Sequence, residues 1–198
     1  MQSSSKPRIL IGVSGSLDST LLPSYLRAIK DRLDCTLTVL MTPNATNFLK
    51  VESVALFADR VISGESPKDW PTDKPGIIAA ENDLLAVLPA TANTLAGVAN
   101  GTALNRLTTV ILVATFPVLF FPVMGGPMWQ KPAVRRNVAR IREDGYEVFD
   151  PVWVDHYDPI LKHNHGHFSL PPPEKVLSII CSRLGGNRTE SAPRASLA

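Results

Sequence analysis

The chain has 198 residues, 44% of them hydrophobic and 19% charged, which is typical of one globular domain with a sizeable core. Its formal net charge of +2 gives no reason to expect nucleic acid or an acidic membrane surface as a partner. Cys35 and Cys181 are too few for a disulfide scaffold and lack the spacing of metal ligands, so we expect a cytoplasmic protein without a metal.

Apolar runs alternate with helical patterns between two polar ends. We expect disorder over residues 1–7, which do not resemble a signal peptide, and over residues 185–198, which lack periodicity. Strands are expected at residues 8–13, 37–41, 60–62, 84–88, 110–114, 118–121 and 146–149. Helices are expected at residues 17–33, 45–50, 92–100, 127–142 and 173–184.

Continuously apolar strands separated by helices are typical of a parallel sheet that is covered on both faces. We therefore predict a single α/β domain over residues 8–184, with a doubly wound (Rossmann-like, flavodoxin-like), mostly parallel sheet and helices on both faces. Sheets of this kind bind ligands at the carboxyl ends of their strands. The segments that follow the strands are therefore the candidate binding residues.

Three strand-end segments are rich in small residues and in hydroxyl or amide side chains. The first contains Gly12, Ser14, Gly15 and Ser16, the second contains Thr42, Asn44 and Thr46, and the third is Pro89-Ala90-Thr91-Ala92-Asn93-Thr94. Small residues in such places let backbone N–H groups face an anion at a helix N-terminus. For the first two segments, a capped turn without a ligand is the alternative. On the residues alone, only an anion site of unspecified kind is predicted.

The third segment resembles the PASANT motif of the homo-oligomeric flavin-containing cysteine decarboxylases, with Thr91 in place of serine. Residues 122–129 resemble that family's P-x-M-N-x-x-M-W motif, with Gly125 in place of asparagine. Residues 105–109 resemble its N-L-L-T segment. The three motifs have the family's order and approximate spacing, and the resemblance covers roughly residues 8 to 180.

The resemblance implies a cofactor, FMN, and two sets of site residues. The cofactor-binding residues would be Gly12, Ser14, Gly15, Ser16, Thr42, Asn44, Thr46, Pro89, Ala90, Thr91, Ala92 and Thr94. The substrate-binding residues would be Asn93, Pro122, Met124, Gly125, Met128 and Trp129. Residues 152–170 would form a flexible clamp over the substrate, and the protein would be a homotrimer or a dodecamer of trimers.

The reaction implied by the resemblance is the oxidative decarboxylation of a cysteine carboxylate. Direct loss of CO2 would leave an unstabilised carbanion, whereas prior oxidation of the thiol carbon to a thioaldehyde provides an electron sink, and FMN takes the hydride. We expect the substrate to be the C-terminal cysteine of a ribosomally synthesised precursor peptide. The product would be an enethiol for aminovinyl-cysteine formation, with biosynthetic partner enzymes as further candidates.

Two alternatives stay open. Phosphopantothenoylcysteine decarboxylase, in coenzyme A synthesis, carries a cysteine in its clamp, whereas residues 152–170 contain none. A non-catalytic FMN-binding regulatory or scaffold subunit is the alternative of another class. It is favoured by Gly125 and by the loss of the family's histidine, whose place falls near Pro75.

The groups that could replace this histidine lie in two stretches. His163, His165 and His167 alternate along the clamp, where an imidazole could act as a base for the thiol. Metal binding is the lesser alternative there, because no acidic or thiol partner has ligand spacing. The second stretch holds Asp73, Lys74, Glu81 and Asn82, for which a solvated loop is the expected place.

Overall fold

The structure is a computed structural model that describes residues 6–66, 68, 70–159 and 162–186. Most of the two expected disordered ends lies outside the described residues. Within the first of them, the described residue Lys6 forms an ion pair with Asp34, with Nζ 2.6 Å from Oδ1. The last helix, α9 (Pro173–Gly186), runs two residues past the expected domain boundary.

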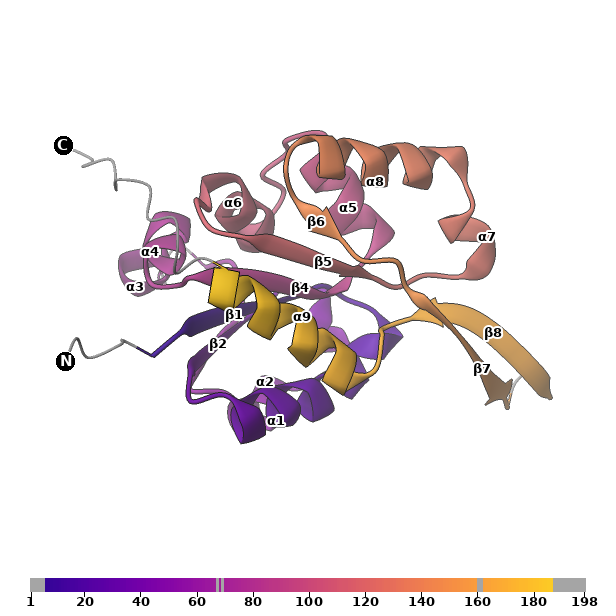
Figure 1. Cartoon of the computed structure of the whole chain (residues 1–198), viewed down its shortest axis with the longest axis horizontal. Coiled ribbons are helices and arrows are strands. Elements are labelled where there is room, and N and C mark those ends of the chain that lie inside the picture. Colours follow the sequence, from indigo (N-terminus) through magenta and orange to yellow (C-terminus); the bar gives the residue numbers. More distant parts are fainter. Residues whose placement is uncertain (1–5, 67, 69, 160–161, 187–198) are drawn as a thin grey trace.

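The core of the protein is a six-stranded sheet in the order β3-β2-β1-β4-β5-β6, in which all neighbours pair in parallel (Figure 1). Its strands are β1 (Arg8–Val13), β2 (Thr36–Met41), β3 (Arg60–Ile62), β4 (Leu84–Ala90), β5 (Val118–Pro122) and β6 (Glu147–Val148). The chain runs outward from β1 to β3 and then returns to β4. The predicted doubly wound sheet is confirmed, and its switch point lies between β1 and β4.

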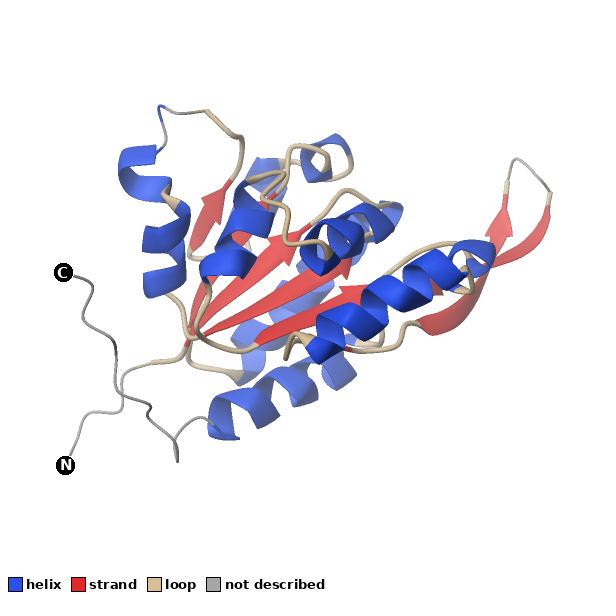
Figure 2. Ribbon diagram, turned by 90° about the horizontal axis from the view of Figure 1, so that it is seen from above, coloured by secondary structure: helices blue, strands red, loops and turns tan. Residues whose placement is uncertain are grey.

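Helices cover both faces of the sheet (Figures 1 and 2). One face carries α9 together with η1 (Leu17–Leu21), α1 (Leu22–Arg32) and α2 (Val51–Ala55), and short η2 (Ala45–Asn47) precedes α2. The other face carries α4 (Pro75–Ala80), α5 (Ala92–Ala99), α6 (Arg106–Val113) and α8 (Pro132–Glu143). No helix within the described ranges is long and apolar enough to cross a membrane.

The strand expected at residues 110–114 was wrong, because this apolar run belongs to the helix α6. The helix begins at a capping box, in which the Asn105 side chain accepts from the Thr108 N–H and Thr108 returns a contact to the Asn105 backbone. Val110 and Ile111 are buried, whereas Leu112 is 43% exposed and Val113 44% exposed. One buried face is the pattern of a surface helix. The prediction failed because periodicity alone cannot tell whether a short apolar run forms a helix or a strand.

Other boundaries also differ from the sequence-based expectation. The helix expected at residues 127–142 is divided into α7 (Gly126–Trp129) and α8, and Pro132 opens the second helix. This is the position in which proline is favoured. The two short helices α3 (Trp70–Asp73) and α4 were not predicted.

The expected clamp contains a β-hairpin made of β7 (Val152–Asp158) and β8 (His163–Ser169), which pair antiparallel. Figure 2 shows the hairpin extending beyond the carboxyl ends of the parallel strands. It therefore reaches out from the edge of the sheet at which the three strand-end segments lie. Its predicted flexibility stays a prediction.

Arg106, the first residue of α6, is a charged residue inside the core. Its side chain is 1% exposed, and its Nη1 lies 3.7 Å from Oδ2 of Asp73. Neither Nη1 nor Nη2 has a hydrogen-bond partner among the described residues. A buried guanidinium with so little compensation is costly, because desolvation opposes the attraction to its partner.

We therefore expect Arg106→Leu to raise the free energy of unfolding by about 1 kcal/mol. Asp73 keeps Arg60 as a partner, with Nη2 2.5 Å from Oδ1, so that the substitution leaves no carboxylate unpaired. Urea denaturation followed by circular dichroism measures the change, with the exposed Arg140→Leu as control. A loss of stability in Arg106→Leu beyond that of the control would contradict this interpretation.

Candidate cofactor and substrate site

The first and third strand-end segments are joined by the side chain of Ser14. Its hydroxyl donates to the carbonyl oxygen of Pro89 at 2.7 Å and accepts from the N–H of Thr91 at 3.0 Å. The N–H of Ser14 also donates to the Pro89 oxygen, at 3.2 Å. Ser14 is buried, so its hydroxyl holds two segments together across the switch point of the sheet.

The first and second segments lie in direct contact at Gly15. A Cβ atom at this position would lie 2.6 Å from Cβ of Asn44 and 2.7 Å from its carbonyl oxygen. The N–H of Thr42 donates to the carbonyl oxygen of Val13 at 2.9 Å. Only glycine permits this approach without moving the backbone of one segment.

Several hydroxyl groups in these segments cap helices, as the alternative interpretation of the sequence proposed. Ser16 accepts from the N–H of Asp18 at the start of η1, and Thr91 accepts from the N–H of Thr94 at the start of α5. The hydroxyl of Thr46 donates to the carbonyl oxygen of Pro43. Capping does not use up these groups, because a hydroxyl oxygen has two acceptor positions.

Thr42 differs from these residues, because its hydroxyl has no partner in the described part of the chain although the atom is buried. A buried polar group without a hydrogen bond costs about 1–3 kcal/mol, so such groups point to a partner that completes them. A phosphate or ribityl oxygen at the end of β2 would supply that partner. The donor set is therefore compatible with a polar, oxygen-rich ligand such as FMN.

Gly12 has a packing role within the core. A Cβ atom there would lie 2.5 Å from Cδ1 of Leu107 and 3.4 Å from Cδ1 of Leu85. The small residue therefore lets α6 approach the sheet closely. Its predicted contact with the cofactor stays a prediction.

The second family-like motif lies next to the third segment. Pro122 ends β5, and the N–H of Val123 donates to the carbonyl oxygen of Ala90 at 3.1 Å. Met124 and Phe168 exchange two backbone hydrogen bonds of 3.0 Å, which fasten the hairpin to this motif. The segment expected to hold the cofactor and the segment expected to hold the substrate are thus neighbours.

The remaining expected substrate residues differ in exposure. Gly125 is the N-cap residue of α7 and contributes no side-chain hydrogen bond. Met128 is 48% exposed, whereas Trp129 is buried, with the guanidinium of Arg135 4.9 Å from its ring centroid. Asn93 is exposed at the start of α5. Met128 and Asn93 are therefore accessible from solvent.

The hairpin presents an aromatic face to this motif. The Trp153 ring meets the Phe168 ring edge-on, with the centroids 5.2 Å apart, and Phe168 lies 6.1 Å from Trp129. A Cβ atom at Gly126 would lie 2.9 Å from the Trp153 ring, and one at Gly166 would overlap it. Two glycines therefore make room for the tryptophan, a contact that no pattern in the sequence indicated.

The opposite face of the hairpin carries the histidines. His167 is 24% exposed, and its Nε2 lies 3.2 Å from Oδ1 of Asp18. The hydroxyl of Ser169 donates to Oδ2 of the same carboxylate at 2.6 Å. His163 and His165 precede His167 in β8, nearer the hairpin turn, and are exposed. Of the three candidate histidines, the structure thus places His167 against Asp18, which lies in η1 directly after the first strand-end segment.

The segment that follows β8 is fixed by Tyr25. Its buried hydroxyl donates to the carbonyl oxygen of Pro171 at 2.7 Å. Burial raises the pKa of Tyr25 above the ordinary range, and the charges of Asp18 and Glu174 add to the effect. The phenol therefore stays protonated and keeps its donor role.

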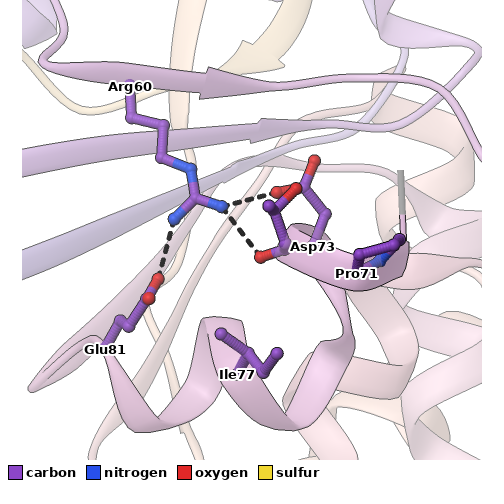
Figure 3. A pocket seen from close by; sticks show the side chains of 6 residues that line it. Arg60, Pro71, Asp73, Ile77 and Glu81 are labelled. Atoms are coloured by element: carbon purple, nitrogen blue, oxygen red, sulfur yellow. Dashed lines mark hydrogen bonds and ion pairs between the residues drawn. The ribbon is translucent and has the colours of Figure 1, made fainter. Parts of the chain in front are cut away.

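The stretch around the lost histidine forms a separate ion-pair cluster (Figure 3). Arg60 binds Asp73 and also Glu81, with Nη1 2.7 Å from Oε2, in an open pocket that shares no lining residue with the three segments. Asn82 is buried and donates to the carbonyl oxygen of Ile78. Lys74 is exposed at the N-cap position of α4. Asp73, Glu81 and Asn82 are thus used in structural contacts.

Three comparisons relate the chain to known proteins. It matches the family model described as Flavoprotein over residues 1–185. It is 34% identical over 175 residues to the mersacidin decarboxylase of a Bacillus species, which covers 87% of this chain and 88% of that enzyme. The FMN-dependent cysteine decarboxylase SpaF superposes with a TM-score of 0.75 at 29% identity, covering 92% of this chain and 98% of SpaF.

A third solved structure contains a peptide. A variant of the peptidyl-cysteine decarboxylase EpiD in complex with the substrate peptide DSYTC superposes with a TM-score of 0.79 at 25% identity. The match covers 89% of this chain and 99% of that one. The similarity therefore extends over nearly the whole of both chains.

Ser14→Ala should lower the free energy of unfolding by about 1–2 kcal/mol, because the N–H of Thr91 loses its acceptor and the carbonyl oxygen of Pro89 loses the buried hydroxyl donor. Ser24→Ala is the matched control, since that exposed hydroxyl donates only to the carbonyl oxygen of Leu21 within its own helix. We expect the control to change stability by less than about 0.5 kcal/mol. Equal effects in urea denaturation would contradict the bridging role of Ser14.

Proposed function

Because the chain belongs to the flavoprotein family, we propose that it is an FMN-dependent enzyme that oxidatively decarboxylates the C-terminal cysteine of a ribosomally synthesised precursor peptide. The product is an enethiol that can be trapped in an aminovinyl-cysteine ring. The similarity to a mersacidin decarboxylase and to an EpiD structure that holds a peptide ending in cysteine supports the peptide as substrate.

The observation that carries the proposal is the joining of the two halves of the site. The third segment is bound to the second motif through Ala90 and Val123, and that motif is bound to the hairpin through Met124 and Phe168. A ligand held by the strand-end segments would therefore lie beside a peptide held under the hairpin. This proximity is what hydride transfer between the two requires.

The cofactor would be held by the three segments at the edge of the sheet. The most specific part of this cradle is formed by the Thr42 hydroxyl, which has no hydrogen-bond partner among the described residues, and by the close approach of Gly15 to Asn44. Ser14 contributes by holding the segments, and the full proposed set is Gly12, Ser14, Gly15, Ser16, Thr42, Asn44, Thr46, Pro89, Ala90, Thr91, Ala92 and Thr94. When bound, FMN supplies the two-electron acceptor that the oxidation of a thiol carbon needs.

The peptide would lie where the hairpin meets the second motif and η1, so that its reacting end can reach the strand-end segments and the histidine-bearing face of the hairpin. Trp129 and Met124 are both buried and would shield the reacting end of the peptide from water. Met128 and Asn93 are exposed and available for contacts with the peptide. Pro122 and Gly125 complete the proposed substrate-binding set.

The first alternative is phosphopantothenoylcysteine decarboxylase. Reduction of the enethiol in that reaction would require a proton donor over the substrate, for which the family resemblance implies a clamp cysteine. Here Cys35 is buried next to β2 and Cys181 lies in α9, so neither belongs to the hairpin. This arrangement favours release of the enethiol.

We further propose that the protein works in the cytoplasm as a homotrimer or a dodecamer of trimers. Large apolar side chains are exposed beside the first two segments, namely Leu17 at 64%, Leu21 at 46% and Phe48 at 44%. Contact with a second copy would cover this apolar surface. An enzyme that supplies the electrophile for ring closure would be a further partner.

The FMN-loaded protein is expected to convert peptides ending in cysteine into products that are lighter by one CO2 and two hydrogens. Synthetic pentapeptides ending in cysteine, DSYTC among them, would be incubated with the protein and analysed by mass spectrometry. The same peptides with serine in place of the terminal cysteine are the controls. Absence of the loss from every cysteine-terminated peptide, in a protein that binds FMN, would favour the non-catalytic scaffold. Conversion of phosphopantothenoylcysteine alone would favour the first alternative.

Gly15→Ala should weaken FMN binding by about five- to a hundredfold, since the new Cβ forces apart two segments of the cradle at a cost of about 1–3 kcal/mol. Gly125→Ala is the matched control, because no atom lies within 4 Å of a Cβ atom built there. Fluorescence titration of FMN measures both affinities. If the two variants bound FMN equally well, the cradle would be misplaced.

A further inference from the structure

The proposed reaction, on which this inference rests, begins with the loss of a proton from the cysteine thiol. A thiolate releases a hydride from its adjacent carbon more readily than a thiol, because the sulfur charge moves into the new C=S bond. A base beside the thiol would raise the fraction of thiolate at neutral pH. Histidine suits this role near neutral pH, and the four histidines of the chain all lie on the hairpin strands β7 and β8.

The contact between η1 and β8 contains the features of such a base. Asp18 is buried two residues after Ser16, and each of its carboxylate oxygens has one partner from β8. The Ser169 hydroxyl donates to Oδ2, which fixes the orientation of the carboxylate. Oδ1 then faces Nε2 of His167 at 3.2 Å.

The contact sets the hydrogen positions on the imidazole ring. An ionised carboxylate can only accept, so Nε2 of His167 carries the hydrogen and Nδ1 of the neutral ring has the free electron pair. Nδ1 is buried and has no hydrogen-bond partner among the described residues. A buried acceptor in this state is completed by a donor that is brought by a ligand, and a thiol is such a donor.

The other titratable groups around the pair are on β7, β8 and α1. The ring of His156 meets that of His167 edge-on, with centroids 5.0 Å apart, and His165 lies 6.1 Å from His156. Tyr25 faces Asp18 from α1 and stays protonated, because burial raises its pKa.

We propose that His167 takes the proton of the substrate thiol through Nδ1 and that Asp18 is the residue that positions it. The S–H bond breaks as the Nδ1–H bond forms; the thiol carbon then loses a hydride and a C=S bond forms, and FMN, when bound, would be the two-electron acceptor of that hydride. Loss of CO2 returns the electron pair to sulfur, and the proton on His167 completes the enethiol. The imidazole ends the cycle neutral, as it began.

The test uses the FMN-loaded enzyme and the best cysteine-terminated pentapeptide of the panel. His167→Gln should lower kcat at about pH 7 by about a hundredfold, a common contribution of a general base. The deficit should shrink as the pH rises past about 8.5, where a thiol ionises without help. His165→Gln on the same strand is the control and should stay within about twofold of the wild type, since ordinary solvated positions carry no such contribution.

Asp18→Asn should also lower kcat at about pH 7, and this deficit should shrink at high pH, because Asp18 acts through His167. The double variant Asp18→Asn with His167→Gln should be no slower than His167→Gln alone. Flavin absorbance and circular dichroism check that each variant binds FMN and is folded. A His167→Gln variant that matches His165→Gln, or a deficit that is equal at all pH values, would overturn the inference. Inactivity of the wild type towards every peptide would instead overturn the proposed function.

Discussion

A closed series of hydrogen bonds around the carboxyl edge of the sheet holds the site together, and the buried hydroxyl of Ser14 is its centre. From there the series, whose hydrogen bonds are linked by peptide bonds between neighbouring residues, passes through the ends of β4 and β8 and the segment after β5. It returns through η1, where the Ser19 hydroxyl donates to the Ser14 carbonyl oxygen at 3.0 Å. Its members in order are Ser14, Thr91, Ala90, Val123, Met124, Phe168, Ser169, Asp18 and Ser19. Segments far apart in the sequence thereby become one structural unit.

This unit explains how one small domain can serve a cofactor and a peptide. The strand-end segments alone would form a polar cradle, and the hairpin alone would be a two-stranded sheet of marginal stability. Joined through Met124 and Phe168, the hairpin gains an aromatic contact on one face and the Asp18 carboxylate on the other. The position of the hairpin thus depends on η1, which directly follows the first strand-end segment.

The sequence predicts the parallel sheet well, because its strands are continuously apolar; even the short β3 was placed at its observed bounds. It fails at residues 110–114, where an apolar run fits both a strand and a half-buried helix. The hairpin strands were not predicted, because they are polar and have no neighbours in the main sheet. The contact of Asp18 with His167 joins residues 149 positions apart, so that no local spacing could indicate it. The family motifs thus predict the cofactor half of the site and the sequence offers three candidate histidines, whereas only the tertiary structure distinguishes His167 from the other two by its contact with Asp18.

The most direct test of the account is to mix the FMN-loaded protein with a cysteine-terminated peptide in the absence of oxygen and to follow the visible absorbance of the flavin. If the protein oxidises the thiol carbon before CO2 leaves, the absorbance of oxidised FMN disappears, with one CO2 released for each flavin reduced. The serine-terminated peptide leaves the flavin oxidised. CO2 release without loss of flavin absorbance, or an unchanged flavin with every cysteine-terminated peptide, would contradict the account.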